Sequence, residues 1–187
     1  MCPWQGEFVE FSEAVASGAG MFGLWSPPAF RGVVDYGTWE AELLEDQDID
    51  RHIRSGAFVP INIHSDGEFQ FLVRIGSAGL PAALTVRERA YLVVASEPYL
   101  FVATDGALLS GIEHAGAKPG PALRVPLPPG RWQVCIFLLD WTAEPGRQDG
   151  EGAPLPGALP DFTLLLNPAP PTAVFRTSIE TFPRAMR

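Results

Sequence analysis

The residues best able to do chemistry surround one predicted turn. His64, Asp66 and Glu68 occupy every second position, and Ser65–Gly67 between them has the composition of a tight turn. Such a turn can bring an imidazole and two carboxylates together, groups that can bind a metal ion, which makes this the best cluster around any of the histidines. A polar hairpin tip without any function has the same composition. We therefore treat the three residues as an alternative polar cluster with no assigned reaction.

Six carboxylates form the densest charged run of the chain. This acidic run consists of Glu40, Glu42, Glu45, Asp46, Asp48 and Asp50. Its last three members resemble the start of an EF-hand calcium loop, which needs glycine at its sixth position and glutamate at its twelfth. Arg51 and Ala57 occupy those positions, so no calcium site is predicted. Two interpretations stay open: a solvated helix face, or a surface that binds a basic protein partner.

No other motif in the chain indicates a reaction. A Gly-x-Ser-x-Gly sequence is absent, and no glycine-rich loop opens a predicted helix as a phosphate-binding loop does. No second cysteine lies near a histidine to complete a zinc site. We therefore predict no catalytic residue, no metal and no cofactor. The sequence favours a protein that is not an enzyme, without deciding the question.

Length and charge restrict the class of protein further. At 187 residues, the chain is expected to form a single domain over residues 1–187. A net charge of −9 argues against nucleic acid as a partner and is compatible with a basic protein. No apolar run is long enough for a membrane, and residues 1–7 do not resemble a signal peptide. The expected location is the cytoplasm, where Cys2 and Cys135 remain thiols; the oligomeric state stays open.

Short apolar runs of period two dominate the chain after Gly56. In Glu68–Ile75 every second residue is large and apolar, and most residues between them are polar. Only a half-buried β-strand gives this alternation. Nine strands are predicted: Ala57–Ile63, Glu68–Ile75, Ala83–Arg89, Tyr91–Ser96, Tyr99–Thr104, Ala107–Glu113, Leu123–Leu127, Arg131–Trp141 and Asp161–Leu166. The pattern predicts an all-β fold, a two-sheet antiparallel β-sandwich with one short helix before the core strands.

That helix is expected at Thr38–Ser55. Thr38 can cap its start, carboxylates lie in its first turn, and Gly56 supplies a stop. The polar stretch Asp46–Asp50 interrupts the apolar stripe of the helix. A helix broken near Asp48 is therefore an equally good prediction.

Three further segments carry expectations of their own. Residues 1–37 are predicted to be irregular with two or three short strands, the last at Arg31–Tyr36. Residues 142–160 are rich in glycine and proline and are expected to form a long loop, either an insertion or a mobile lid. The part Val134–Leu139 of a long strand is apolar on both faces, which predicts a central strand covered on each side.

The order of these signals resembles a known family. An acidic helix led by Trp39 ends at Gly56, and a strand, the Ser65–Gly67 turn and an amphipathic strand follow it. The pattern continues with Arg87–Val94, a strand pair across Asp105 and Gly106, and Val125–Val134. It is similar to small bacterial β-sandwich proteins of the competence protein J type. The resemblance implies a β-sandwich and a role as inhibitor of a partner nuclease, and it brings no catalytic residues.

Three functional hypotheses follow. The first is a non-enzymatic binding or interaction module, of the inhibitor or immunity type, that docks a basic partner through the acidic run. The second is a small-ligand binder or enzyme whose site lies on loops at one end of the sandwich, where the His64 turn, Glu113–His114 and residues 142–160 converge. The third is a structural domain of a larger assembly. The sequence favours the first, although fold alone does not separate them.

Overall fold

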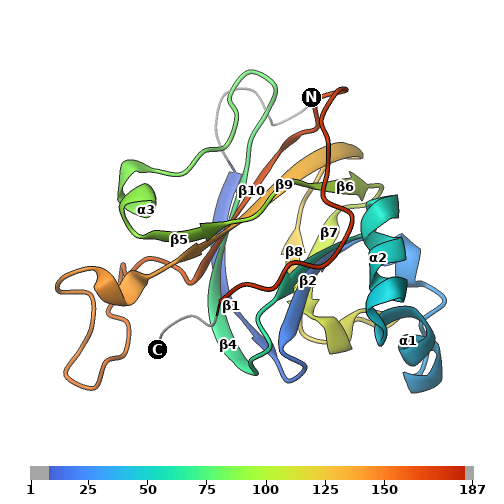
Figure 1. Ribbon diagram of the computed structural model, residues 1–187, viewed down its shortest axis with the longest axis horizontal. Coiled ribbons are helices and arrows are strands. Elements are labelled where there is room, and N and C mark those ends of the chain that lie inside the picture. Colours follow the sequence, from blue (N-terminus) through green and yellow to red (C-terminus); the bar gives the residue numbers. More distant parts are fainter. Residues whose placement is uncertain (1–8, 184–187) are drawn as a thin grey trace.

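The chain folds mainly into β-strands, which form two sheets. A computed structural model describes residues 9–183, and within this range one sheet has six strands and the other four (Figure 1). The six-stranded sheet is ordered β1 (Val9–Ser17), β4 (Gly67–Ile75), β10 (Phe162–Pro168), β9 (Gly130–Leu139) and β5 (Leu92–Ala95), with β6 (Tyr99–Ala103) also paired to β9. The four-stranded sheet is ordered β3 (Phe58–Asn62), β2 (Met21–Trp25), β7 (Ala107–Gly111) and β8 (Leu123–Val125). The prediction of a mainly β fold with two sheets is confirmed.

Short helices connect the strands. In the described range these are α1 (Tyr36–Leu43), α2 (Asp46–Ser55) and α3 (Val86–Ala90), with 3₁₀ turns at Pro27–Phe30, Ile112–His114 and Trp141–Ala143. The helices α1 and α2 follow β2, and α2 packs against β3 and β6. In Figure 1 this helix pair lies at the right, whereas α3 and residues 142–160 lie at the left. The two regions with irregular or helical structure therefore occupy opposite ends of the molecule.

The larger sheet is mixed, so the prediction of a wholly antiparallel sandwich is wrong in this respect. β10 runs antiparallel to β9 on one side and parallel to β4 on the other. Side chains alternate along a strand whatever the direction of its neighbours, so the local pattern does not encode that direction. The direction of β10 depends on the long connection after β9, which returns the chain next to β4.

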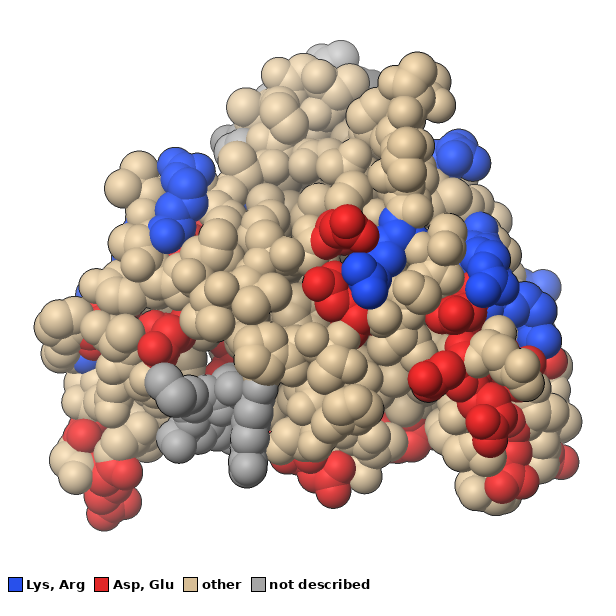
Figure 2. Space-filling view, viewed as in Figure 1, with Lys and Arg blue, Asp and Glu red and all other residues tan. Residues whose placement is uncertain are grey.

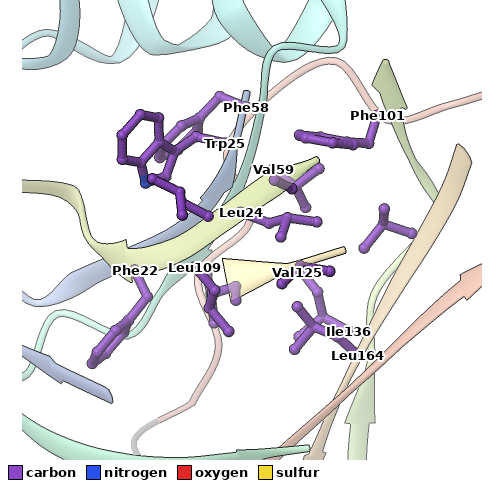
Figure 3. Packing of buried hydrophobic residues seen from close by; sticks show 14 of the residues in the cluster. Phe22, Leu24, Trp25, Phe58, Val59, Phe101, Leu109, Val125, Ile136 and Leu164 are labelled. Atoms are coloured by element: carbon purple, nitrogen blue, oxygen red, sulfur yellow. The ribbon is translucent and has the colours of Figure 1, made fainter. Parts of the chain in front are cut away.

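Side chains from both sheets meet in one hydrophobic cluster, which holds the sheets together. Figure 3 shows part of it, including the fully buried side chains of Leu24, Leu109, Ile136 and Leu164. Removing apolar surface from water is the dominant stabilising term, about 25 cal/mol for each Å². One polar pair is buried with the cluster: Trp25 Nε1 donates to Ser110 Oγ at 3.0 Å, so neither group lacks a partner.

The predicted helix Thr38–Ser55 consists of two helices, so the prediction of one continuous helix is wrong. The structure agrees with the alternative of a broken helix, although the break lies at Leu44–Glu45 and not near Asp48. Asp35 is the N-cap of α1: its carboxylate accepts a hydrogen bond from Thr38 N at 2.9 Å, and Asp35 N donates to Thr38 Oγ1 at 3.0 Å. This capping box starts the helix earlier than expected and places Thr38 inside it. α2 ends at Gly56 as predicted, where φ is 75°.

A further difference lies between β4 and β5, where a strand is predicted at Ala83–Arg89. The structure has α3 there, and its start is a second capping box. Glu88 N donates to Thr85 Oγ1 at 3.1 Å, and the Glu88 carboxylate accepts from Thr85 N. The Thr-x-x-Glu signal for a helix start outweighs the apolar alternation of so short a run.

Two segments expected to be irregular contribute to the sheets or to the packing. β1 lies in the amino-terminal segment and pairs along its whole length with β4. Within residues 142–160, Leu159 is buried against Trp141, whereas residues 151–157 are exposed. This segment is therefore anchored at its carboxyl end and exposed over its middle.

The central position of β9 is confirmed, but its outer face is only half covered. β9 pairs with β5, β6 and β10. Its inward side chains are buried, whereas Cys135 and Phe137 on the outer face keep partial exposure. The thiol of Cys135 is free, and Cys2 lies outside the described residues.

Candidate functional site

The acidic run lies on the helix pair α1–α2. Leu43, Ile49 and Ile53 turn the apolar faces of the two helices into the core. Trp39 Nε1 donates to Ile112 O at 3.0 Å, which ties α1 to the chain after β7. Because the apolar stripe is buried, the carboxylates lie on the solvent side. Figure 2 shows acidic side chains gathered at the lower right, the region of α1 and α2 in Figure 1, with basic side chains beside them.

Two members of the run, Glu42 and Asp48, bind Arg51 of the same helix pair. Glu42 Oε2 accepts a hydrogen bond from Arg51 Nη2 at 2.9 Å and lies 2.9 Å from His52 Nε2. Asp48 accepts from Arg51 Nη1, also at 2.9 Å. Partial burial raises the pKa of Glu42, but the hydrogen bonds from His52 and Arg51 outweigh it and lower this pKa below its usual value. These contacts fix the orientation of Arg51 between two carboxylates.

Two more members have partners of other kinds. Asp50 Oδ1 accepts from the backbone N of Ile179 at 3.2 Å, which ties α2 to the carboxyl-terminal segment. Asp50 Oδ2 also lies 3.5 Å from Arg54. Glu40 accepts a hydrogen bond from the hydroxyl of Tyr36, and this contact raises the pKa of Tyr36. Asp50 therefore has a structural role in addition to its charge.

Glu45 and Asp46 are the open carboxylates of the run. Both are exposed at the junction of the helices, and neither forms an ion pair with any residue between 9 and 183. Asp46 lies in the first turn of α2, where the helix dipole stabilises a negative charge. Residues 36–55 contain six carboxylates and two arginines, so the helix pair carries a net charge of −4.

A hollow of about 440 Å³ lies beside the start of α1, and we call it the α1 hollow. It is lined by Val33–Tyr36 and Trp39 on one side and by Glu113–Gly116, Lys118 and Gly120 on the other. The rings of Tyr36 and Trp39 are stacked, with centroids 6.1 Å apart and 19° between their planes. Val34 and Tyr36 leave 68% and 69% of their surface exposed. Exposed aromatic and aliphatic groups around a concave site are typical of a binding surface.

Charged groups surround the α1 hollow. Hydrogen bonds from the backbone N and then the hydroxyl of Thr38 lower the pKa of Asp35, which keeps this carboxylate ionised. Glu113 is held in place by a hydrogen bond from Gly18 N at 2.8 Å. Lys118 is exposed and forms no ion pair with any described residue. The hollow thus has two positioned carboxylates in its lining and one exposed ammonium group that is unpaired among the described residues.

A second concave site, with a volume of about 1340 Å³, lies on the outer face of β1 and β4. We call it the outer groove. Its floor contains Glu10, Gln70, Arg74 and other outward residues of these strands, and residues 151–161 and part of α3 form its walls. Asp161 is buried there, accepting from Gln70 N at 2.7 Å and from Trp141 Nε1 at 3.0 Å. These bonds attach the end of the long loop to the floor.

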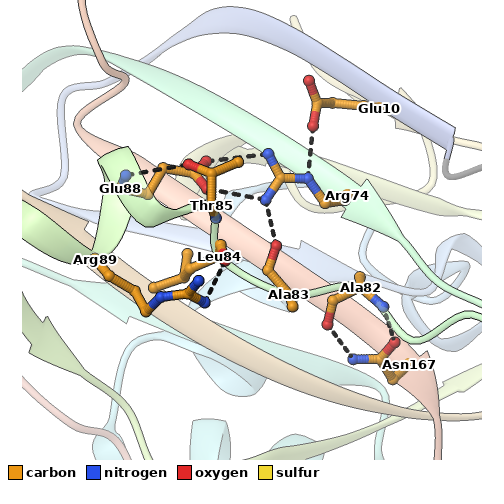
Figure 4. A network of polar contacts seen from close by, with 9 residues as sticks. All are labelled: Glu10, Arg74, Ala82, Ala83, Leu84, Thr85, Glu88, Arg89 and Asn167. Carbon is orange, nitrogen blue, oxygen red and sulfur yellow. Dashed lines mark hydrogen bonds and ion pairs between the residues drawn. The ribbon is translucent and has the colours of Figure 1, made fainter.

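The guanidinium groups of the outer groove are held by protein carboxylates (Figure 4). Arg74 donates from Nε to Glu10 at 2.6 Å, and from Nη1 and Nη2 to the two oxygens of Glu88 at 3.1 Å each. Burial raises the pKa of Glu88, but the hydrogen bonds from Arg74 and Thr85 outweigh it and lower this pKa. Arg87 makes a similar two-bond contact with Glu144. The network connects β4 to α3. The guanidinium groups that could bind an anionic ligand are already paired with carboxylates of the protein.

The structure places the alternative polar cluster in two environments. The predicted Ser65–Gly67 turn connects β3 to β4, which belong to different sheets. His64 Nε2 lies 3.3 Å from Asn62 Nδ2 and 3.5 Å from Thr181 Oγ1, next to the carboxyl-terminal segment. Glu68 instead lines the outer groove. In the described part of the chain, no three His, Cys, Asp or Glu side chains are grouped closely enough to hold a metal ion.

The loop residues of the second hypothesis do not converge on one site. Glu68 and residues 151–161 line the outer groove, whereas Glu113 and His114 line the α1 hollow. The place of Tyr36 in the lining of the hollow is not predicted, because Arg31–Tyr36 is expected to be a strand, whereas Tyr36 begins α1. The signal that could have revealed the hollow is the spacing of Tyr36 and Trp39, three residues apart at a helix start, which places both rings on one side.

The α-helices of residues 9–183 are short, the longest having ten residues, and none is both long and apolar enough to cross a membrane. The outer groove, the α1 hollow and the acidic helix pair are candidate recognition sites on the described surface. Of these, the helix pair and the α1 hollow lie side by side, because Tyr36 and Trp39 belong to α1.

The fold is similar to that of proteins of the competence protein J type, which confirms at the level of fold the resemblance found in the sequence. One solved structure is ComJ from Bacillus subtilis, described as an inhibitor of the DNA-degrading activity of NucA; it has 12% identity and a TM-score of 0.52, over 88% of this chain and 100% of that one. Another is described as crocagin biosynthetic gene J, with 15% identity and a TM-score of 0.51, over 87% of this chain and 97% of that one. At such identities the likeness concerns the fold alone. No protein-family model and no curated protein sequence matches the chain.

Proposed function

We propose that the protein is a non-enzymatic interaction module of the inhibitor or immunity type, which binds a basic protein partner. The observation that carries this proposal is the surface of the helix pair, where a net charge of −4 lies next to exposed apolar side chains. Protein-binding surfaces combine these two features, because charge steers the encounter and apolar groups provide affinity. ComJ, which has a similar fold, is described as an inhibitor of a DNA-degrading protein, and this supports the proposal by analogy.

The carboxylates of the acidic run have two different roles in such a surface. Glu45 and Asp46 are exposed and open to basic side chains of a partner. Glu42 and Asp48 hold Arg51, so the surface around the open carboxylates is ordered before binding. An ordered surface loses less conformational entropy when a partner binds, which favours a stable complex.

A second candidate function is the binding of a small ligand in the outer groove. Its volume of about 1340 Å³ and its anchored wall favour this alternative. The carboxylates of Glu10 and Glu88 already neutralise Arg74, so a neutral or cationic ligand fits the groove better than an anion. Mass spectrometry of the natively purified protein tests this alternative, since a bound metabolite would remain associated with the folded chain.

The proposed function is tested by a pull-down from the native host with the full chain as bait, followed by association kinetics with the captured protein. Because exposed charges are screened by salt, the association rate should fall as the salt concentration rises. Replacing three carboxylates of the run in one variant, Glu45→Gln, Asp46→Asn and Asp48→Asn, should lower the association rate and leave dissociation nearly unchanged.

A matched variant controls for total charge. Glu13→Gln, Glu97→Gln and Asp105→Asn remove three exposed carboxylates outside the helix pair, so both variants have the same net charge. The control variant should associate at nearly the wild-type rate. Equal slowing of the two variants would mean that only the total charge matters. A captured partner that binds both variants at the wild-type rate, without salt dependence, would refute the proposed surface.

A further inference from the structure

We infer that the α1 hollow is the anchoring pocket for one arginine side chain of the partner. The inference rests on the proposed function and adds the chemistry of its central contact. The hollow combines stacked aromatic rings, an aliphatic wall and carboxylates in its lining. An arginine side chain has the matching features, because it carries a flat cation on an apolar stem.

The two rings provide the stacking surface. Tyr36 and Trp39 both line the hollow, and their planes differ by only 19°. Trp39 is fixed by its hydrogen bond to Ile112 O, whereas the ring of Tyr36 is largely exposed. A guanidinium over the face of an aromatic ring is attracted by the negative charge of the π-system, and arginine stacks there more readily than lysine.

The charges of the lining favour a cation. Asp35 and Glu113 are held in place by hydrogen bonds from Thr38 and Gly18, and the open carboxylates of the acidic run belong to the adjacent helix pair. Lys118 opposes a cation, but its side chain is exposed and has no described partner that would hold it in the hollow. His114 also lines the hollow, with its Nε2 3.7 Å from Glu113 Oε1. With this histidine counted as neutral, the lining has two carboxylates and one ammonium group, a net charge of −1, and removing the charge of Lys118 should strengthen binding.

The walls are formed before the partner binds. Ala117 N donates to Val33 O at 2.8 Å, which joins the two sides of the hollow through the backbone. Gly116 permits this close approach, since a Cβ atom there would lie 3.0 Å from Val33 O. The volume of about 440 Å³ lies within the range of about 300–1,000 Å³ found for ligand pockets. A preformed pocket of this size accepts one long side chain without reordering the protein.

The inference is tested with N-acetyl-arginine amide as the probe and N-acetyl-citrulline amide as its neutral isostere. Nuclear magnetic resonance of the full chain follows the indole N–H signals, and Trp39→Phe identifies the signal of Trp39. The arginine probe should shift this signal in a saturable manner. The citrulline probe should bind about fivefold more weakly, the ratio that about 1 kcal/mol of lost cation–π attraction gives.

Four variants complete the test. Tyr36→Ala should weaken binding of the arginine probe about threefold or more, and Tyr36→Phe, which keeps the ring, should retain it. Lys118→Gln should strengthen binding about twofold, because it removes one repulsive charge. Val174→Ala changes an exposed apolar residue outside the hollow and should have no effect. Unchanged methyl signals of the core and unchanged indole signals of the tryptophans other than Trp39, which stacks on Tyr36, establish that each variant is folded.

Failure of this inference differs from failure of the proposed function. No saturable shift of the Trp39 signal, equal affinity for both probes, or wild-type affinity of Tyr36→Ala would overturn the pocket. If the pocket fails while the acidic-run variant still slows a captured partner, the interaction surface stands and only its anchor is wrong. If arginine binds in the hollow but the acidic-run variant has no effect on the partner, the pocket stands and the proposed function fails.

Discussion

Replacing Glu88 by glutamine should destabilise the fold by about 3 kcal/mol, although the change removes only one charge. Glu88 and Arg74 are buried, with 3% and 5% of their surface exposed. In the variant, the buried guanidinium of Arg74 therefore faces a neutral amide in place of a carboxylate. Removing one partner of a buried ion pair costs about 3–5 kcal/mol. We expect the lower end of this range, because Glu10 still contacts Arg74 at 2.6 Å.

The glutamine also isolates the effect of charge from that of helix capping. Its side-chain oxygen can still accept the hydrogen bond from Thr85 N, so the capping box of α3 is kept. In a chain of this size, 3 kcal/mol corresponds to a fall in Tm of about 6–12 °C. Replacing both partners, Arg74→Met with Glu88→Gln, should recover most of the loss, because no unpaired charge is then buried and the capping box is kept.

The effect should depend on pH in a defined direction. The pKa of Glu88 is lowered in the folded state, so its contribution is present above the ordinary glutamate pKa of about 4.3 and is lost as pH falls through the folded-state pKa. Urea unfolding followed by tryptophan fluorescence measures the free energy of unfolding at each pH. Wild type and Glu88→Gln should differ most near neutral pH and converge in acid. A loss below about 1 kcal/mol at neutral pH, or parallel pH profiles, would refute the reasoning.

Three further outcomes follow from the same structure. Glu42→Gln breaks an ion pair that is partly exposed, so the free energy of unfolding should fall by at most about 1 kcal/mol, and a larger loss would mean that this pair is buried. Trypsin should cut first within residues 142–160, at Arg147, since residues 151–157 beside it are exposed; resistance of this segment would indicate a packed lid. Calcium or zinc should leave Tm unchanged within about 1 °C, and a shift of several degrees would reveal a site that the described residues do not form.

Local sequence patterns predicted the elements whose signals lie within a few residues. The alternation in Glu68–Ile75 corresponds to β4, and Gly56 ends α2 in the left-handed conformation. The predicted strand at Ala83–Arg89 failed because two local signals compete there, and the capping box prevails over the apolar alternation. Local signals are reliable where they agree and ambiguous where they conflict.

Two turns show that the local sequence does not determine which sheet the next strand joins. Ser65–Gly67 and Asp105–Gly106 both have the composition of a hairpin turn, yet each connects strands of different sheets. Turn residues set the reversal of the backbone, whereas the sheet that the next strand joins depends on which of its faces can be buried against the rest of the chain. The separation of His64 from the outer groove, where Glu68 lies, is a consequence of this crossing.

The sequence by itself determined the mainly β class, the acidic run and its place on helical structure, because these depend on side-chain period and charge along a few consecutive residues. Only the tertiary structure decided which carboxylates stay open, and that Glu42 binds Arg51 of the other helix and Asp50 binds the backbone of Ile179. It alone brought Trp39 beside the chain that follows β7, which forms the α1 hollow. Contacts between residues far apart in sequence depend on the packing of the whole chain, and no local pattern encodes them.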